Sequence, residues 1–182
     1  MIVLVAHALL GIATVWWLVR ANPEVFRRAG SGPLMSPIEV VLYAVGIASV
    51  IGGYAFNIAF VHKYSHLGGV HNPLWGHGSW AQFIHLMYAN PAAGSAGVDY
   101  TIANVVLLPL VTVRGARRHN INRPWLFFVS TLFTSFTFGW AFYAASLERQ
   151  RRVADGSAGG SATQPPPPDA STALVTDGRV GL

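Results

Sequence analysis

The sequence predicts an all-α integral membrane protein, a bundle of four transmembrane helices followed by a disordered C-terminal tail. Three observations predict this class. Only 10% of the 182 residues are charged and 52% are hydrophobic, which is too little charge to cover a water-soluble globule. The basic residues stand in short clusters between long apolar runs. The chain has no cysteine, which excludes disulfide scaffolds, thiolate metal sites and thiol nucleophiles.

Four segments are long and apolar enough to cross a bilayer, whose hydrocarbon core requires about 20 apolar residues. We expect the first at residues 2–19, the second at 40–61 and the third at 94–113. The fourth is expected as one continuous helix from Pro124 to Leu147. Five phenylalanines of this last segment are expected to face lipid: Phe127, Phe128, Phe133, Phe136 and Phe138.

We divide the chain into three parts. Residues 1–22 form an N-terminal transmembrane helix, which we expect to be retained because no basic residue precedes its apolar run. Residues 38–152 form a three-helix membrane domain, in which a connection rich in His, Trp and Gly, residues 62–97, folds over the mouth of the bundle. Residues 153–182 are rich in Pro, Gly, Ser and Ala, a composition that predicts a disordered tail.

The distribution of basic residues predicts an orientation. The first connection contains Arg27 and Arg28, the third contains four arginines, and the second contains only Lys63. With four crossings, the first and third connections would lie in the cytoplasm of a bacterial cell, and both termini would lie outside its plasma membrane. Three arginines that follow the fourth segment oppose this assignment: Arg149, Arg151 and Arg152.

Two carboxylates are weak candidates for catalysis. Asp99 stands more than one turn inside the third predicted helix, where an ionised carboxylate costs up to about 3 kcal/mol. With Glu39 and Asn104, it suggests a membrane lipid-modifying enzyme that uses a buried carboxyl for proton transfer. The interpretation we favour is that Glu39 and Asp99 each complement the positive end of a helix dipole.

Histidines gather around the second connection. His62 and His66 would share a helix face if the second helix continued past Lys63, and His71 and His77 follow. This spacing permits a metal or haem site, but Asp99 is the one carboxylate nearby and no glutamate lies between the first two histidines. We therefore expect structural roles and no cofactor, and keep a histidine-based metal or haem protein as the third hypothesis.

Small residues recur at short intervals in two of the predicted helices and would let helix backbones approach closely. We expect them to pack within the bundle or against a partner. The packing residues are Gly46, Ser49 and Gly53 on the second helix, and Thr131, Ser135 and Gly139 on the fourth.

Several short elements in the second half of the chain carry a family resemblance. They are Ala89-Asn90-Pro91, the helix-opening Asp99, Arg117-Arg118 with Trp125, and the run from Ser135-Phe136-Thr137-Phe138 to Glu148-Arg149. With these, the chain resembles a bacterial family of small integral-membrane proteins classed as a domain of unknown function, over residues 43–152 and best over 89–152. It departs from the family pattern at Trp140-Ala141-Phe142, where Pro-Leu-Phe is expected, and in its additional first helix and long tail. The resemblance implies membrane residence and compact helical hairpins, and no activity.

The sequence thus predicts an integral membrane protein with a structural, accessory or small-ligand-binding role, and favours a protein that is not an enzyme. The lipid-modifying enzyme is the alternative. The expected partners are membrane lipids and a membrane protein, with no nucleic acid.

Overall fold

The computed structural model describes residues 2–27, 33–67, 72 and 74–162, and this part of the chain contains helices and no strand. The all-α class is therefore confirmed for the described residues. In chain order the elements are α1 (Ile2–Ala21), α2 (Pro23–Phe26), α3 (Pro37–Tyr64), α4 (Trp80–Met87), α5 (Pro91–Thr101), the π-helix η1 (Ile102–Leu107), α6 (Leu108–His119), α7 (Trp125–Phe133) and α8 (Phe136–Ala162).

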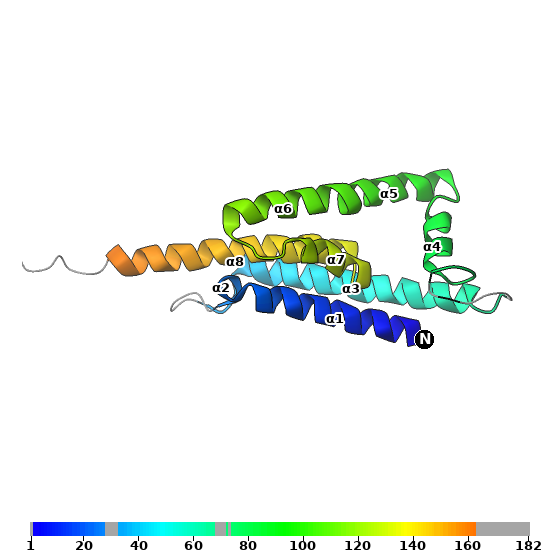
Figure 1. The fold of residues 1–182 in the computed structure, drawn as a ribbon, viewed down its shortest axis with the longest axis horizontal. Coiled ribbons are helices and arrows are strands. Elements are labelled where there is room, and N and C mark those ends of the chain that lie inside the picture. The colour runs from blue at the N-terminus through cyan, green and yellow to red at the C-terminus, as the bar shows by residue number, and fades with distance from the viewer. Residues whose placement is uncertain (1, 28–32, 68–71, 73, 163–182) are drawn as a thin grey trace, which may run out of the picture.

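Three segments are long and apolar enough to cross a membrane: Leu4–Ala21, Pro37–Tyr64 and Pro91–Ala116. The last is built from α5, η1 and α6, which follow one another as one rod in Figure 1. These segments bury little of their surface inside the protein. In α3 the share is 6%, and the Phe56 ring is 80% exposed. Apolar surface of this extent needs a lipid environment, which identifies the chain as a membrane protein.

The single helix expected from Pro124 to Leu147 is wrong. The helix α7 ends at Phe133, the backbone turns at Thr134 and Ser135, and α8 runs back along α7. Across the hairpin, the centroids of the Phe127 and Tyr143 rings are accordingly 5.2 Å apart. The nine residues of α7 are about 14 Å long and the apolar residues 136–147 of α8 about 18 Å, so neither crosses a core of about 30 Å.

Hydroxyl side chains explain the break. The Thr134 hydroxyl donates to the Ser130 carbonyl (2.7 Å), and the Ser135 hydroxyl accepts from the Phe138 N–H (3.2 Å), as the side chain of an N-cap residue does. Ser and Thr compete in this way with helical hydrogen bonds. An unbroken apolar run therefore contains the end of one helix and the start of the next.

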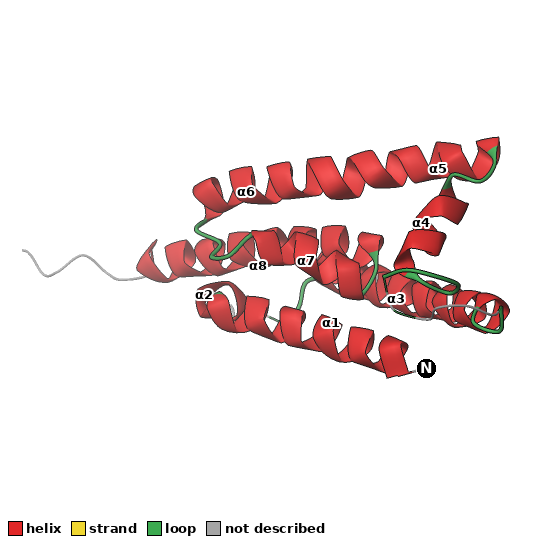
Figure 2. Ribbon diagram, turned by 45° about the vertical axis from the view of Figure 1, so that its right-hand side comes forward, coloured by secondary structure: helices red, strands yellow, loops and turns green. Residues whose placement is uncertain are grey.

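The hairpin of α7 and α8 occupies the interior of the bundle. It lies between the α5–α6 rod and the layer of α1 and α3 (Figure 2). Leu126 and Ala145 are fully buried, and Phe127 is 1% exposed. The expectation that this phenylalanine faces lipid is wrong for the same reason, whereas Phe128, Phe133, Phe136 and Phe138 are half-buried.

The turn of the hairpin is packed closely against α1 and α3. A Cβ built on Gly11 of α1 would lie 3.0 Å from the Phe133 carbonyl oxygen, so a larger residue would fit here only if the turn shifted. On α3, the Ser49 hydroxyl lies 2.6 Å from the Ser135 hydroxyl, and the Tyr54 hydroxyl donates to the Phe133 carbonyl (2.9 Å). The polar groups at the turn therefore find partners inside the protein.

The predicted small residues meet across several elements. On α3, Gly46 faces Phe138, and a Cβ on Gly53 would lie 3.8 Å from the Ser135 Cβ. Thr131, Ser135 and Gly139 do not form one stripe, because they lie on α7, in the turn and on α8. Gly139 instead faces Thr131 across the hairpin.

The connection between α3 and α5 contains α4, which runs across the other helices in Figure 1. The Ser79 hydroxyl caps α4 by accepting from the Gln82 N–H (3.3 Å). At the other end of the chain, α8 continues to Ala162, ten residues past the predicted boundary at Arg152. No proline interrupts the helix before this point. The rest of the predicted tail, 163–182, lies outside the described residues.

Close packing of the hairpin predicts an unequal effect of two glycine substitutions. In Gly139→Ala, the added Cβ would lie 3.1 Å from the Phe127 carbonyl oxygen and closer still to Thr131, so we expect a loss of about 1 to 3 kcal/mol in unfolding free energy. In Gly52→Ala, the Cβ meets nothing within 4 Å, so stability should stay the same or rise slightly. Unfolding in detergent measures both, and equal losses would contradict this packing.

Candidate functional site

Glu39 is a fully buried carboxylate at the start of α3. It forms a capping box with Ser36, whose N–H donates to Glu39 Oε2 (2.6 Å) and whose hydroxyl accepts from the Glu39 N–H (3.1 Å). Arg149 of α8 pairs with Glu39 Oε1 at 3.3 Å, and Arg152 pairs with Oε2. The carboxylate therefore has a cap and two cations around it, and no open side toward a substrate.

The two arginines also bind the connection that precedes α3. Arg149 donates to the carbonyls of Leu34 (3.2 Å) and Arg27 (3.3 Å), and Arg152 donates to the carbonyl of Pro33 (2.6 Å). These contacts hold the end of α2, the start of α3 and the middle of α8 together. The arrangement is that of a structural ion network.

Asp99 lies on α5 in a different setting. Its side chain is exposed and, among the described residues, forms no hydrogen bond or ion pair. It follows Pro91 by eight residues, which is about 12 Å along the helix. The structure therefore places Asp99 on the outside of a segment that is apolar enough to cross the membrane.

Small residues surround Asp99 on the same side of the helix. At 100° per residue, Ala92, Ser95, Ala96 and Asp99 share one face, which we call the α5 outer face, and all four are exposed. The opposite side of α5 packs on α4, where a Cβ on Gly97 would lie 2.8 Å from the Met87 Cγ. Nothing in the described chain covers the α5 outer face.

The π-helix η1 connects α5 to α6. Pro109 has no N–H, and in place of a regular α-helical ladder the Leu108 N–H donates to the Ala103 carbonyl, five residues back. Asn104 is buried inside this turn, and its amide donates to the Thr131 hydroxyl (3.1 Å). The helix irregularity beside Pro109 is thus a π-helical turn that joins the rod to the hairpin.

The candidate metal ligands that the structure describes do not form a site of three ligands. His62, His66 and His77 are exposed, and His71 lies outside the described residues. Within the described ranges, no three side chains of His, Asp or Glu are close enough to hold a metal ion. Glu39 and Asp99 are also apart from each other, since α3 begins at one end of the bundle and α5 at the other (Figure 1).

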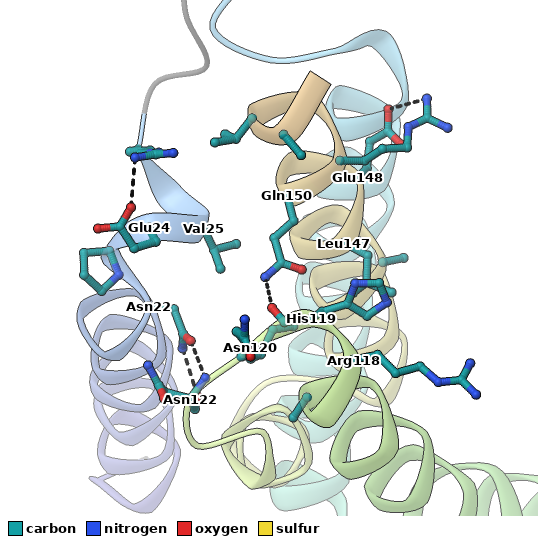
Figure 3. A pocket seen from close by; sticks show the side chains of 18 of the residues that line it. Asn22, Glu24, Val25, Arg118, His119, Asn120, Asn122, Leu147, Glu148 and Gln150 are labelled. Atoms are coloured by element: carbon teal, nitrogen blue, oxygen red, sulfur yellow. Dashed lines mark hydrogen bonds and ion pairs between the residues drawn. The ribbon is translucent and has the colours of Figure 1, made fainter. Parts of the chain in front are cut away.

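A cavity of about 1310 Å³ lies at the end of the bundle that contains Glu39. Figure 3 shows it between α2, the turn after α6 and α8. Asn22 bridges its floor: its amide donates to the Asn122 carbonyl (2.9 Å), and its side-chain oxygen accepts from the Asn122 N–H (2.6 Å). Gln150 donates to the His119 carbonyl (2.5 Å). The cavity is open to the outside of the protein.

Sequence analysis missed the residues that build this end of the bundle. Asn22 and Asn122 are one hundred positions apart, and no local pattern pairs them. The Ser36–Glu39 capping box was a signal in the sequence, because Ser followed three residues later by Glu before an apolar run is typical of a helix start.

Comparison with known proteins gives one family. The family described as Protein of unknown function DUF2834 matches residues 41–149, more than half of the chain. The match starts near the beginning of α3, includes Asp99 and ends at Arg149, and α1 precedes it. No curated protein and no solved structure matches the chain. The resemblance to a family of unknown function is confirmed by this match.

The buried ion network predicts a large effect of one charge. In Glu39→Gln, the buried Arg149 loses its acidic partner, so we expect a loss of about 3 to 5 kcal/mol in unfolding free energy. The matched control is Glu24→Gln, which breaks an exposed pair with Arg27 and should cost at most about 1 kcal/mol. Denaturation in detergent compares the two, and a Glu39→Gln loss no larger than that of the control would contradict a structural role for Glu39.

Proposed function

We propose that this chain, which belongs to the family described as Protein of unknown function DUF2834, is an accessory membrane protein. It assembles with a second membrane protein through the α5 outer face. One observation carries this proposal. Asp99 is an exposed, unpaired carboxylate on a helix that can cross the membrane. Ionisable side chains at such positions are costly, and they generally pair with another group.

The depth of Asp99 supports a partner inside the membrane. Arg114 follows Asp99 by 15 residues, or about 22 Å, and basic residues of this kind lie at the membrane boundary. In a core of about 30 Å, Asp99 is then about 8 Å from the opposite boundary. This position is too deep for full hydration.

The chemistry of the α5 outer face indicates the partner. Three small residues, Ala92, Ser95 and Ala96, let a second helix approach closely. A lysine or arginine at matching depth on that helix would neutralise Asp99. We therefore propose a transmembrane helix with one basic residue as the partner.

A second copy of this chain fits the face less well. The basic residue nearest to that end of the bundle among the described residues is Lys63, which is one position before the end of α3. Asp99 is about 12 Å inside the start of α5, so the two charges differ in depth. A second copy would leave Asp99 without a cation at its own level.

The lipid-modifying enzyme receives less support from the same geometry. Such an enzyme needs a buried carboxyl that can exchange a proton next to a bound lipid. Glu39 is buried, but its oxygens are engaged by Ser36, Arg149 and Arg152. Asp99 faces outward, away from the hairpin.

The hairpin also supports a revised orientation in a bacterial plasma membrane. Because α7 and α8 enter and leave from the same side, the chain would cross three times, and residue 2 and the end of α8 would lie on opposite sides. Nine of the basic residues in the described ranges would then share one side, against Lys63 on the other. The nine are Arg20, Arg27, Arg114, Arg117, Arg118, Arg123, Arg149, Arg151 and Arg152.

This distribution favours the arginine side as cytoplasmic. The three arginines after the last apolar segment opposed a bundle of four crossings, and they agree with three crossings and a hairpin. We propose that residue 2 lies outside the cell and that α8 ends in the cytoplasm.

Assembly through Asp99 predicts selective capture of a basic helix. The probe is a polyleucine transmembrane peptide with one lysine about 8 Å from an end of its apolar segment and one cysteine a turn away. The chain has no cysteine, so Ser95→Cys, one turn from Asp99, gives a single reporter. In phosphatidylcholine vesicles we expect about fivefold more disulfide with the lysine peptide than with an all-leucine peptide, because a polar contact between membrane helices contributes about 1 kcal/mol.

Asp99→Asn should remove this excess, whereas Asp155→Asn, an exposed carboxylate on α8, should keep it. Equal yields with both peptides would overturn the proposal. Disulfides between two copies of the chain that outcompete the lysine peptide would also overturn it, in favour of self-association.

The orientation predicts a labelling pattern in intact cells. Single cysteines at three exposed positions, Ala89→Cys, His119→Cys and Ala154→Cys, are treated with a thiol reagent that does not cross membranes. We expect Ala89→Cys to react and the other two to be protected until the cells are opened. Reaction of Ala154→Cys together with Ala89→Cys would restore four crossings.

A further inference from the structure

We propose that the cavity at the end of the bundle that contains Glu39 binds the phosphate group of an anionic membrane lipid. The cavity has a volume of about 1310 Å³ and is open to the outside. It lies at the end of the bundle that contains α2, the turn between α6 and α7, and the middle of α8 (Figure 3). Nothing proposed for Asp99 depends on it, because Asp99 is near the other end of the rod.

Three arginines line the cavity, and all three are exposed. Arg27 and Arg151 are 54% and 69% exposed, and their pairs with Glu24 (3.0 Å) and Glu148 (3.6 Å) each join residues three positions apart. Exposed pairs of this kind contribute little stability. Arg118 is exposed and has no acidic partner among the described residues. A phosphate can therefore pair with these guanidinium groups without destabilising the folded protein.

The wall of the same cavity is apolar. Val25 is 4% exposed, and Ile38, Leu42 and Leu147 continue the wall along α3 and α8. A free anion gains nothing from such a surface. A phospholipid does, because the first methylene groups of its chains can cover the wall while its phosphate reaches the arginines.

Tryptophans give independent evidence that this end lies at headgroup level. Trp16, Trp17 and Trp125 are 63%, 42% and 45% exposed, and the rings of the last two are in edge contact at 5.5 Å. Exposed tryptophans concentrate where the hydrocarbon core meets the headgroups. Arg123 lies 4.8 Å from the centroid of the Trp17 ring, so this aromatic group and the basic end are at one level. The cavity is therefore placed where phospholipid phosphates are found.

The charge around the cavity matches an anion. The buried Arg149 and the half-buried Arg152 share the single carboxylate of Glu39 behind the cavity wall. Near the wall, Glu24 and Glu148 offset only part of the positive charge of the three lining arginines. A zwitterionic lipid offers no net negative charge to this surface, so we infer an anionic lipid.

The test uses the purified full chain in detergent. Its melting temperature is measured with dihexanoyl-phosphatidylglycerol, with dihexanoyl-phosphatidylcholine and with inorganic phosphate. We expect a saturable rise with the anionic lipid, a much smaller rise with the zwitterionic lipid, and none with inorganic phosphate at the same concentration. An equal response to both lipids would overturn the proposal, and an equal response to inorganic phosphate would overturn a lipid as the source of the phosphate.

Matched variants locate the site. Arg118→Gln should weaken the apparent affinity for the anionic lipid about fivefold without changing the melting temperature of the free protein, because this side chain holds nothing in the fold. Lys63→Gln removes the same charge at the opposite end of α3 and should leave the affinity unchanged. Equal weakening by both variants would show attraction to the whole protein, and would overturn a site in this cavity.

Discussion

Every polar backbone group at membrane depth must find a partner inside the protein. The break between α7 and α8 leaves backbone groups without helical partners, so these groups need other partners within the bundle. The turn at Thr134 and Ser135 interrupts the helical hydrogen bonds in the interior of the bundle. The Tyr54 hydroxyl binds the Phe133 carbonyl, and the Ser135 side chain caps α8. Gly11 of α1 follows from the same requirement, because a larger residue there would press on the Phe133 carbonyl and the Thr134 side chain at the turn that α1 covers.

The return of the chain at this turn also brings the arginines of α8 to the end of the bundle that contains Glu39. Because α8 comes back beside α7, Arg149 reaches Glu39, which is 110 positions earlier. A fourth crossing would have carried Arg149 to the opposite side of the membrane, away from the start of α3. The buried ion network and the hairpin thus depend on each other. Two of the three arginines that opposed a bundle of four crossings, Arg149 and Arg152, are the ones that pair with Glu39 and hold α8 beside the start of α3.

The sequence was sufficient for the parts of the fold that depend on composition and length. The apolar runs predicted α1, α3 and the α5–α6 rod, since a spanning helix needs about 20 apolar residues and few other structures use them. The run from Pro124 to Leu147 met the same criterion and was wrong, because hydropathy does not distinguish a helix that crosses from two that turn back. Two local signals pointed to the break: Thr134-Ser135 in the middle of the run, and the arginines after it. The pairing of Asn22 with Asn122 had no such signal, since it depends on how distant elements pack.

The two carboxylates show why residue type alone could not assign the candidate site. The sequence allowed the same interpretation for both, a charge at the positive end of a helix dipole, but only Glu39 lies in the first turn of its helix, and Asp99 lies eight residues after the start of α5. In the fold, Glu39 is enclosed by a capping hydroxyl and two arginines, so its charge is compensated within the chain. Asp99 has no such neighbours on the α5 outer face, and the surrounding small residues leave room for another helix. Compensation inside the chain makes a carboxylate part of the structure, whereas an exposed carboxylate in the membrane needs its counter-charge from outside. The difference between the two carboxylates lies in what packs against each helix, and it is the basis for the structural role of Glu39 and for the assembly that we propose at Asp99.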